Sequence, residues 1–169
     1  CPIVLVDPVT GERSDEGEIC IDLSQHPTNL MTGYVADPER NAEASAGGYF
    51  HTGDIASRDE NGSLTYIGRT DDIFKSSDFK VSPFEVESAL LEHAFVAEAA
   101  VVGAPDDTRL NVTKAYVALA AGVAESSETA RAILAHAREV LPPYMRVRRV
   151  EFFALPKTAS GKIRRVELR

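Results

Sequence analysis

The sequence predicts an α+β fold in which a β-rich part precedes a small α/β-sandwich-like domain, built from a short mixed sheet with flanking helices. Two observations predict it. In the first third of the chain, short apolar runs alternate with turn-forming stretches, a pattern typical of short strands. Further on, apolar residues at helical spacing alternate with β-rich runs that end at Gly or Pro. The change places the β-rich part at residues 1–69, a linker at 70–72 and the small domain at 73–169.

The β-rich part is expected to hold several short strands. The apolar runs IVLV (residues 3–6) and EICIDL (18–23) are bounded by turn-forming stretches such as DPVTGERSDEGE and DPER. The run GSLTYIGR (62–69) follows the turn ENG and alternates Leu64 and Tyr66 with small or polar residues, so it predicts one arm of a hairpin.

A helix is expected to begin after residue 82. Ser82 stands at an N-cap position, Pro83 at the first helical position and Glu85 three residues after the cap, which together form a capping-box pattern. The buried face of this helix is expected to consist of Val86, Ala89 and Leu90.

Two strands, a second helix and a third strand are expected to follow. VAEAAVVGAP (96–105) and TKAYVALAAG (113–122) are β-rich runs that end at Gly and Pro. ETARAILAHAREVL (128–141) has helical periodicity until Pro142 ends it, and RRVEFFA (148–154) supplies the last strand. The apolar stripe of the second helix is predicted to be Ile133, Leu134, Ala137, Val140 and Leu141.

The charge is distributed unevenly. Residues 142–169 contain eight Lys or Arg and two Glu, a net +6, so residues 1–141 carry −14 of the total of −8. An acidic body with a basic tail argues against broad nucleic-acid binding, which needs a basic face interleaved with aromatic residues. It favours a local site for an anion.

The cysteines and the hydropathy pattern predict a cytoplasmic protein. Cys1 and Cys20 have no CxxC spacing, and both are expected to be structural or incidental in a reducing compartment. No apolar run reaches the roughly 18 residues of a membrane span, and no signal peptide is evident. Because the chain starts at Cys1 with a strand-like run, we expect it to begin inside a larger protein.

Several familiar catalytic motifs are absent from the sequence. The loop ASGK is not a nucleotide-binding P-loop, because Pro156 and Ile163 replace the required Gly and Ser or Thr. No Gly-x-Ser-x-Gly motif is present. The histidines are never paired at i, i+4 and have no cysteine at zinc-ligand spacing, so no metal site is predicted at His26, His51, His93 or His136.

Three remaining stretches occur in one order: YFHTGD (49–54), GRTDDIFKSSDFKVSPFEVE (68–87) and LPKTASGKIRR (155–165). Together they strongly resemble the AMP-forming acyl-CoA synthetases, a superfamily that also includes peptide-synthetase adenylation domains and beetle luciferase. The resemblance covers essentially the whole chain. It implies the C-terminal portion of such an enzyme: the last β-subdomain of the large domain, a hinge and a mobile small domain.

The resemblance implies a nucleotide site in the β-rich part. Asp54 matches the aspartate that accepts hydrogen bonds from both ribose hydroxyls of ATP, which its two oxygens allow. Arg69 resembles the arginine that also reaches the nucleotide, and Tyr66 stands where the family lines the ribose and base. Asp71 matches the hinge position, whose torsions change when the small domain swings.

Lys162 resembles the catalytic lysine of the family. That lysine bridges the attacking carboxylate and the α-phosphate while pyrophosphate leaves, so its charge stabilises the transition state. Ser160 and Gly161 are expected to let the loop enter a narrow cleft. Because acetylation would remove the charge, a lysine acetyltransferase or deacetylase acting on Lys162 is a candidate partner.

A second face of the small domain is implied for the step that uses CoA. The family presents this face after a domain rotation, and Lys80 would then lie near the AMP phosphate. An aromatic residue followed two positions later by Arg suits stacking on the CoA adenine and contact with its phosphates, although Tyr144 is equally well read as a core residue. The residues assigned to CoA binding and to this face are Lys75, Ser77, Asp78, Phe79, Tyr144 and Arg146.

The sequence departs from the family at a few positions. The family usually has Gly at the place of Asp78, where a carboxylate is expected to narrow the pantetheine tunnel and repel phosphate. Leu110 and Asn111 replace the usual Gly and acid or amide, so that loop is expected to take another turn. His51 stands where Arg or Lys is common.

The expected function is therefore that of a C-terminal fragment of an acyl-CoA synthetase in fatty acid metabolism. The full enzyme would use a small carboxylic acid, ATP with Mg²⁺ held by the large domain, and CoA, and the fragment alone is expected to be inactive. A peptide-synthetase adenylation domain shares the three stretches, although the sequence PKTASGK is more similar to that of the CoA ligases. A non-catalytic regulatory module is the other alternative, which joint retention of Asp54, Arg69 and Lys162 disfavours.

Overall fold

The computed structural model describes residues 2–169, which form two compact units. The first unit ends at Asp71 and the second begins at Asp72. None of the helices in the described part of the chain is both long and apolar enough to cross a bilayer. Cys1, for which the sequence predicts a structural or incidental role, lies outside the described residues.

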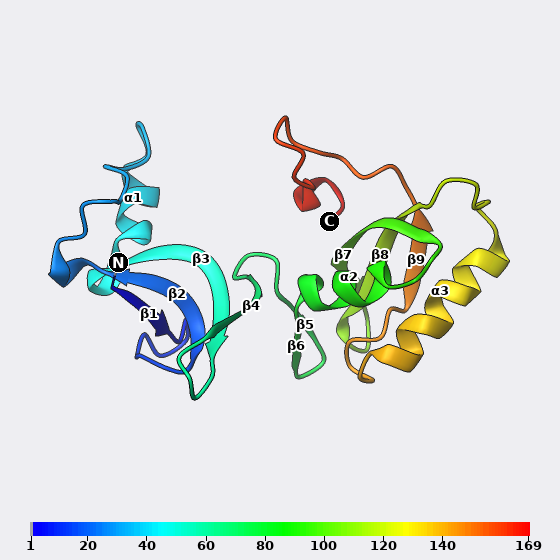
Figure 1. Ribbon diagram of the computed structural model, residues 1–169, viewed down its shortest axis with the longest axis horizontal. Coiled ribbons are helices and arrows are strands. Elements are labelled where there is room, and N and C mark those ends of the chain that lie inside the picture. The colour runs from blue at the N-terminus through cyan, green and yellow to red at the C-terminus, as the bar shows by residue number, and fades with distance from the viewer. Residues whose placement is uncertain (1) are drawn as a thin grey trace. The chain divides into compact units, whose positions relative to one another are not determined.

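The N-terminal unit is built on a four-stranded antiparallel sheet in the order β1-β2-β3-β4 (Figure 1). The predicted hairpin is confirmed, since β3 and β4 pair across the ENG turn. The strands are β1 (Ile3–Val6), β2 (Glu16–Asp22), β3 (Tyr49–Arg58) and β4 (Leu64–Arg69), and two 3-10 turns cover Leu23–Gln25 and Ala46–Gly48.

A short helix in this unit is missed by the sequence analysis. The stretch DPER is predicted to be a turn, which is wrong, because it begins α1 (Pro38–Ala44). Asp37 caps the helix by accepting a hydrogen bond from Arg40 N at 3.0 Å, and Pro38 occupies the first turn. No residue of α1 is buried, so the sequence has no apolar stripe that could reveal it.

The C-terminal unit contains the predicted short mixed sheet with flanking helices. In the sheet order β7-β8-β9, β7 pairs with β8 antiparallel and β8 with β9 parallel. A small hairpin of β5 and β6 precedes them. The elements are β5 (Phe74–Ser76), β6 (Phe79–Val81), α2 (Pro83–Leu91), β7 (Val96–Asp106), β8 (Leu110–Leu119), α3 (Ser127–Val140), β9 (Arg149–Phe152) and a 3-10 turn at Arg165–Glu167.

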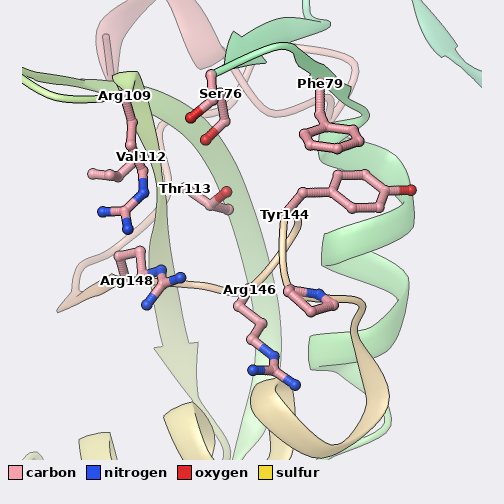
Figure 2. A pocket seen from close by; sticks show the side chains of 10 residues that line it. Ser76, Phe79, Arg109, Val112, Thr113, Tyr144, Arg146 and Arg148 are labelled. Carbon is pink, nitrogen blue, oxygen red and sulfur yellow. The ribbon is translucent and has the colours of Figure 1, made fainter.

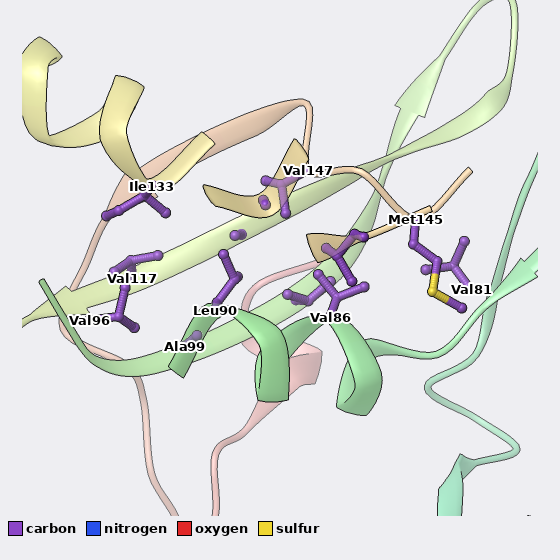
Figure 3. Packing of buried hydrophobic residues seen from close by; sticks show 13 residues of the cluster. Val81, Val86, Leu90, Val96, Ala99, Val117, Ile133, Met145 and Val147 are labelled. Atoms are coloured by element: carbon purple, nitrogen blue, oxygen red, sulfur yellow. The ribbon is translucent and has the colours of Figure 1, made fainter. Parts of the chain in front are cut away.

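Both helices pack on one face of this sheet and form the main core, as Figure 3 shows. Val86 and Leu90 of α2 and Ile133 of α3 are fully buried there, which confirms the predicted stripes at these positions. The prediction for Val140 is wrong, because this residue is 44% exposed, whereas Leu141, just beyond the helix, is buried as predicted. Ser82 accepts the hydrogen bond from Glu85 N at 3.4 Å, as the capping-box pattern predicts.

The opposite face of the sheet is covered by the C-terminal segment of the chain. Alternate residues of β7, Ala100 and Val102, point away from the helices and pack against Leu155 and Leu168. The segment 155–168, which contains the loop ASGK, is thereby attached to the sheet face formed by Ala100 and Val102.

Candidate functional site

Asp54 and Arg69 lie side by side in the N-terminal unit. They are directly opposite partners in the β3–β4 pairing, and Arg69 Nη1 lies 3.4 Å from Asp54 Oδ1. Arg69 Nε also donates to Asp71 Oδ1 at 3.0 Å. The structure thus brings together three of the predicted residues and leaves the side chains of Asp54 and Arg69 38% and 45% exposed. Tyr66, three residues before Arg69 on β4, is 42% exposed.

Gly53 allows this arrangement because of its backbone and its lack of a side chain. Its φ of +78° lies in the left-handed region that favours glycine. A Cβ at this position would lie 2.7 Å from Arg69 Nη2, so a side chain would displace the guanidinium. Gly53 O accepts from Thr70 N at 2.9 Å, which holds the end of β4 against β3.

The C-terminal unit has a pocket with an aromatic side and a basic side (Figure 2). Phe79 of β6 and Tyr144 stack with ring centroids 4.7 Å apart and planes at 21°. Their rings line the pocket together with residues from the β5–β6 hairpin, β8 and the segment after α3. Tyr144 is also partly buried against the core, which supports the core interpretation in part, whereas its contact with the CoA adenine stays a prediction. The lining residues are Ser76, Ser77, Phe79, Arg109, Val112, Thr113, Pro143, Tyr144, Arg146 and Arg148.

Three guanidinium groups belong to the lining, and Figure 2 shows Arg109 and Arg148 opposite the aromatic pair and Arg146 at the lower edge of the pocket. Arg146 is predicted from the sequence, whereas Arg109 and Arg148 are not. Arg109 is held by local hydrogen bonds: its N donates to Asp106 Oδ1 at 3.0 Å and its carbonyl accepts from Ser77 N at 2.8 Å. Converging cations on one wall create a positive potential that attracts a polyanion.

Thr113 supplies an unpaired hydroxyl in the same pocket. The residue is 1% exposed, and its Oγ1 has no hydrogen-bond partner within residues 2–169. A buried hydroxyl without a partner destabilises the fold by about 1–3 kcal/mol, so such a group often marks the place of a ligand or water. The polar wall of the pocket can therefore accept one more hydrogen-bonding group.

The β5–β6 hairpin holds the remaining predicted residues of this face. Lys75 and Lys80 are directly opposite on the two strands and both are exposed. Ser77 lines the pocket and has a φ of +54°, so the left-handed position of this turn falls on Ser77. Asp78 is exposed at the tip of the turn and is not among the lining residues of the described pocket.

The β7–β8 turn supports this hairpin. Asn111 Nδ2 donates to Lys75 O at 3.0 Å. Leu110 adopts a φ of +66°, in the left-handed region, which costs a leucine about 1 kcal/mol. A leucine at this position therefore introduces strain beside the pocket.

Lys162 stands on an exposed turn that is closed by Thr158. Thr158 N donates to Lys162 O at 2.8 Å, and Lys162 N donates to Thr158 Oγ1 at 3.1 Å. Gly161 has a φ of +83° and open space where a side chain would stand. Within residues 2–169, Lys162 forms no ion pair, whereas Lys157 in the same loop pairs with Glu98 at 2.6 Å.

A charged cluster missed by the sequence analysis anchors this loop. Arg165 donates from Nε and Nη2 to the two carboxylate oxygens of Glu87, at 3.1 and 2.6 Å. Arg165 Nη1 also reaches Asp72 Oδ2 at 3.2 Å, and Arg169 reaches Asp72 Oδ1 at 2.6 Å. Burial raises the pKa of the Glu87 carboxyl, although Arg165 opposes this shift. The segment that follows Lys162 is therefore tied to α2 and to the first residue of the unit.

The lysine turn and the pocket lie at separate places on the C-terminal unit. Figure 1 shows the orange-red loop that precedes the C-terminus at one end of the unit, while β5 and β6 lie toward the other end. None of the pocket's lining residues belongs to the segment 155–165. One unit thus presents the lysine turn and the pocket at two different places.

Comparison with known proteins decides the family. Residues 85–162 match the family model described as the AMP-binding enzyme C-terminal domain. A relative from Metallosphaera sedula, 4-hydroxybutyrate–CoA ligase 1, is 51% identical over 154 residues, which cover 90% of this chain and 27% of the relative. The C-terminal unit matches the C-terminal domain of the AMP-binding enzymes. The human acyl-coenzyme A synthetase ACSM1, mitochondrial, is 42% identical over 158 residues, 91% of this chain and 27% of the relative.

Solved structures extend the likeness to nearly the whole chain. The anthranilate CoA ligase AuaEII, in complex with anthranoyl-AMP, has a TM-score of 0.87 at 35% identity, over 98% of this chain and 32% of that one. The o-succinylbenzoate CoA synthetase MenE from Bacillus subtilis, in complex with the acyl-adenylate OSB-AMP, has a TM-score of 0.85 at 30% identity, over 99% and 33%. The family resemblance and the fold class predicted from the sequence are thereby confirmed. The chain spans about a quarter to a third of the length of these relatives.

Proposed function

We propose that the protein containing this chain is an ATP-dependent acyl-CoA synthetase. A carboxylic acid attacks the α-phosphate of ATP to give acyl-AMP and pyrophosphate, and the CoA thiol then attacks the acyl carbon and releases AMP. The observation that carries the proposal is the presence, on one compact unit, of an exposed unpaired lysine and of a separate pocket with an aromatic and a basic wall. The two faces suit the two steps of one reaction.

In the first step, the chain provides groups for the ribose and for the developing charge. The carboxylate of Asp54 accepts the hydrogen bonds of the two ribose hydroxyls, and Arg69 fixes its orientation from the opposite strand. Tyr66 offers an aromatic face to the nucleotide. Lys162 neutralises the charge shared by the attacking carboxylate and the α-phosphate. Mg²⁺ accompanies ATP and is expected to be held by residues outside this chain.

In the second step, the pocket holds CoA. The adenine stacks on the pair formed by Phe79 and Tyr144, and the arginines bind the phosphates with charge-assisted hydrogen bonds. Ser77 and the hydroxyl of Thr113 are available to polar groups of the cofactor. Lys75 and Lys80 add positive charge on the two strands of the hairpin, and Lys80 is placed toward the AMP phosphate. Asp78 stays at the tip of the hairpin, outside the pocket lining.

The proposal is tested by measuring both steps of the reaction with a panel of carboxylic acids. Acid-dependent exchange of labelled pyrophosphate into ATP without CoA, followed by thioester formation when CoA is added, is the expected result for the full-length protein. Pyrophosphate exchange without any CoA thioester would favour an adenylation domain that passes the acyl group to another acceptor. No exchange with any acid would contradict the proposal.

The pocket makes a specific prediction about CoA. Arg148→Ala should raise the KM for CoA about 10- to 100-fold, because a charge-assisted hydrogen bond contributes about 1.5–3 kcal/mol. Adenylation should be unchanged. Arg149→Ala is the matched control, since Arg149 is exposed on β9 and does not line the pocket. Equal KM values for the two variants would show that the pocket does not bind CoA.

The segment 70–72 is proposed as the hinge that lets each face act in turn. Asp71→Pro fixes one backbone torsion and should therefore slow one half-reaction at least about 10-fold more than the other. Asp71→Ala is the control, because it removes the carboxylate that accepts from Arg69 but keeps the torsional freedom. If Asp71→Ala slows the same half-reaction as much as Asp71→Pro does, the effect comes from loss of the carboxylate and not from restriction of the hinge.

Further features stay predictions. Acetylation of Lys162 by an acetyltransferase would remove the charge on which adenylation depends. The cytoplasmic location and the place in fatty acid metabolism are likewise expected from the sequence, and the acid itself is to be found with the substrate panel.

A further inference from the structure

A second group of chemically active side chains lies in the N-terminal unit, on β2 and on the part of β3 that precedes Asp54. Glu18 and Cys20 of β2 face His51 of β3, and Cys20 and His51 are directly opposite in the strand pairing. One ligand atom from each side chain lies within 4.8 Å of the other two. Glu18 and Cys20 are buried, with 8% and 0% exposure. We infer that Glu18, Cys20 and His51 form a binding site for a divalent transition metal of the zinc type.

The distances fit such a cation with little movement. His51 Nδ1 lies 3.5 Å from Cys20 Sγ, and tetrahedral Zn²⁺ with ordinary bond lengths separates a nitrogen and a sulfur ligand by about 3.5 Å. Glu18 Oε2 lies closer, 2.8 Å from the same nitrogen. Binding requires this oxygen to withdraw by about 0.6 Å, which a small rotation of the carboxylate about Oε1 achieves while Oε1 keeps its hydrogen bond from Gly53 N at 2.7 Å.

The proton arrangement also favours a cation at Nδ1. A carboxylate and a carbonyl only accept hydrogen bonds, yet His51 Nδ1 faces Glu18 Oε2 and His51 Nε2 faces Ala46 O at 3.3 Å. A neutral imidazole has a single N–H, so both contacts are satisfied only by the doubly protonated imidazolium or when a metal ion takes the place of the proton at Nδ1. With the metal on Nδ1, the Nε2–H donates to the Ala46 carbonyl, which is the usual outer partner of a metal-bound histidine.

The ligand types select among metals. A thiolate, an imidazole and a carboxylate form a mixed set that suits Zn²⁺ and disfavours Mg²⁺ or Ca²⁺, which take oxygen ligands. A hollow lined by Glu18, His51, Thr52 and Gly53 adjoins the cluster, so water can supply a fourth ligand. Without a metal, burial and the charge of Glu18 raise the pKa of Cys20 to about 12, so the thiol is not a nucleophile.

The cluster does not have the geometry of a nucleophilic triad. In such a triad the acid would contact the imidazole nitrogen remote from the nucleophile. Here Glu18 and Cys20 contact the same nitrogen, Nδ1. A metal at this point would join β2 to β3 immediately before Thr52, Gly53 and Asp54, and so would brace the strand that carries the predicted ribose ligand.

Metal titration of the full-length protein, without substrates, tests the inference independently of any ligase activity. Zn²⁺ should bind and raise the melting temperature, and Co²⁺ should bind in its place with a thiolate charge-transfer absorption. Cys20→Ser should abolish that absorption, and Cys20→Ser and Glu18→Gln should each weaken Zn²⁺ binding at least about 100-fold. Glu18→Gln nearly preserves the size of the side chain, so it decides the question if Cys20→Ser fails to fold.

Two control variants make the result specific. His26→Asn changes an exposed histidine of the same unit and should leave Zn²⁺ binding unaltered. Cys1→Ser removes the other cysteine of the chain and should keep the Co²⁺ absorption. The inference is overturned if wild-type protein shows no Zn²⁺-dependent shift in melting temperature, or if Cys20→Ser binds Co²⁺ with the wild-type spectrum.

Discussion

Replacing Lys162 by alanine in the full-length protein should slow formation of the acyl-adenylate by about 10²- to 10³-fold, equivalent to about 3–4 kcal/mol. Charge accumulates on the attacking carboxylate and the α-phosphate only while this bond forms. Lys162 is exposed, forms no ion pair within residues 2–169 and is therefore available to that charge. Thioester formation from preformed acyl-AMP should continue at the wild-type rate, because the pocket on the other face serves that step.

The control for this prediction is another lysine of the same loop. Lys157→Ala removes the same charge as Lys162→Ala, but the charge of Lys157 is already paired with Glu98. Its adenylation rate should stay within a few-fold of wild type. If Lys157→Ala and Lys162→Ala lose the same activity, the loop contributes only a general positive potential.

Replacing Arg165 by alanine should lower the free energy of unfolding of the C-terminal unit by about 3–5 kcal/mol. The variant leaves the buried carboxylate of Glu87 without the guanidinium that contacts both of its oxygens. It also removes the contact between the lysine loop and Asp72. Chemical denaturation of the variant and the wild type measures the loss.

Arg164→Ala is the matched control for Arg165→Ala. Arg164 pairs with Glu167 three residues later, with both side chains about half exposed, so its removal should cost only about 0.3–0.5 kcal/mol. A similar cost for Arg164→Ala and Arg165→Ala would mean that the cluster around Glu87 does not anchor the segment.

The same cluster predicts an unusual dependence of stability on pH. Burial raises the folded-state pKa of Glu87, so the folded state binds this proton more strongly than the unfolded state does. The contribution of Glu87 to stability is therefore largest below its ordinary pKa and falls as pH rises through the raised value. Without Arg165 the pKa should rise further, so the destabilisation of Arg165→Ala should be smaller near about pH 5 than at pH 7.

The sequence predicts most of the fold because its signals are local. The capping box at Ser82 and the buried stripes, Val86 and Leu90 on α2 and Ile133 on α3, each depend on spacing within one helix. Helix α1 has no buried residue, so no periodicity marks it. The strands β5 and β6 are only three residues each and lie within a stretch that the sequence analysis assigns to function rather than structure.

The parts of the site that the sequence does not predict are brought together by folding. Arg109 and Arg148 are far apart in the chain and meet at one wall of a pocket. Glu87 is buried because Arg165 binds its carboxylate. The sequence does not predict this pair, because the two residues are 78 positions apart. Cys20 and His51 meet through the strand pairing of β2 and β3, which motif spacing does not reveal.

The central claim is that the two faces of the C-terminal unit serve different steps of one reaction. Its most direct test measures both half-reaction rates, at subsaturating CoA, in two variants of the full-length protein. Lys162→Ala should lose adenylation and keep thioester formation from acyl-AMP, whereas Arg148→Ala should keep adenylation and lose thioester formation. The account is contradicted if both variants lose the same step, or if each loses both steps equally.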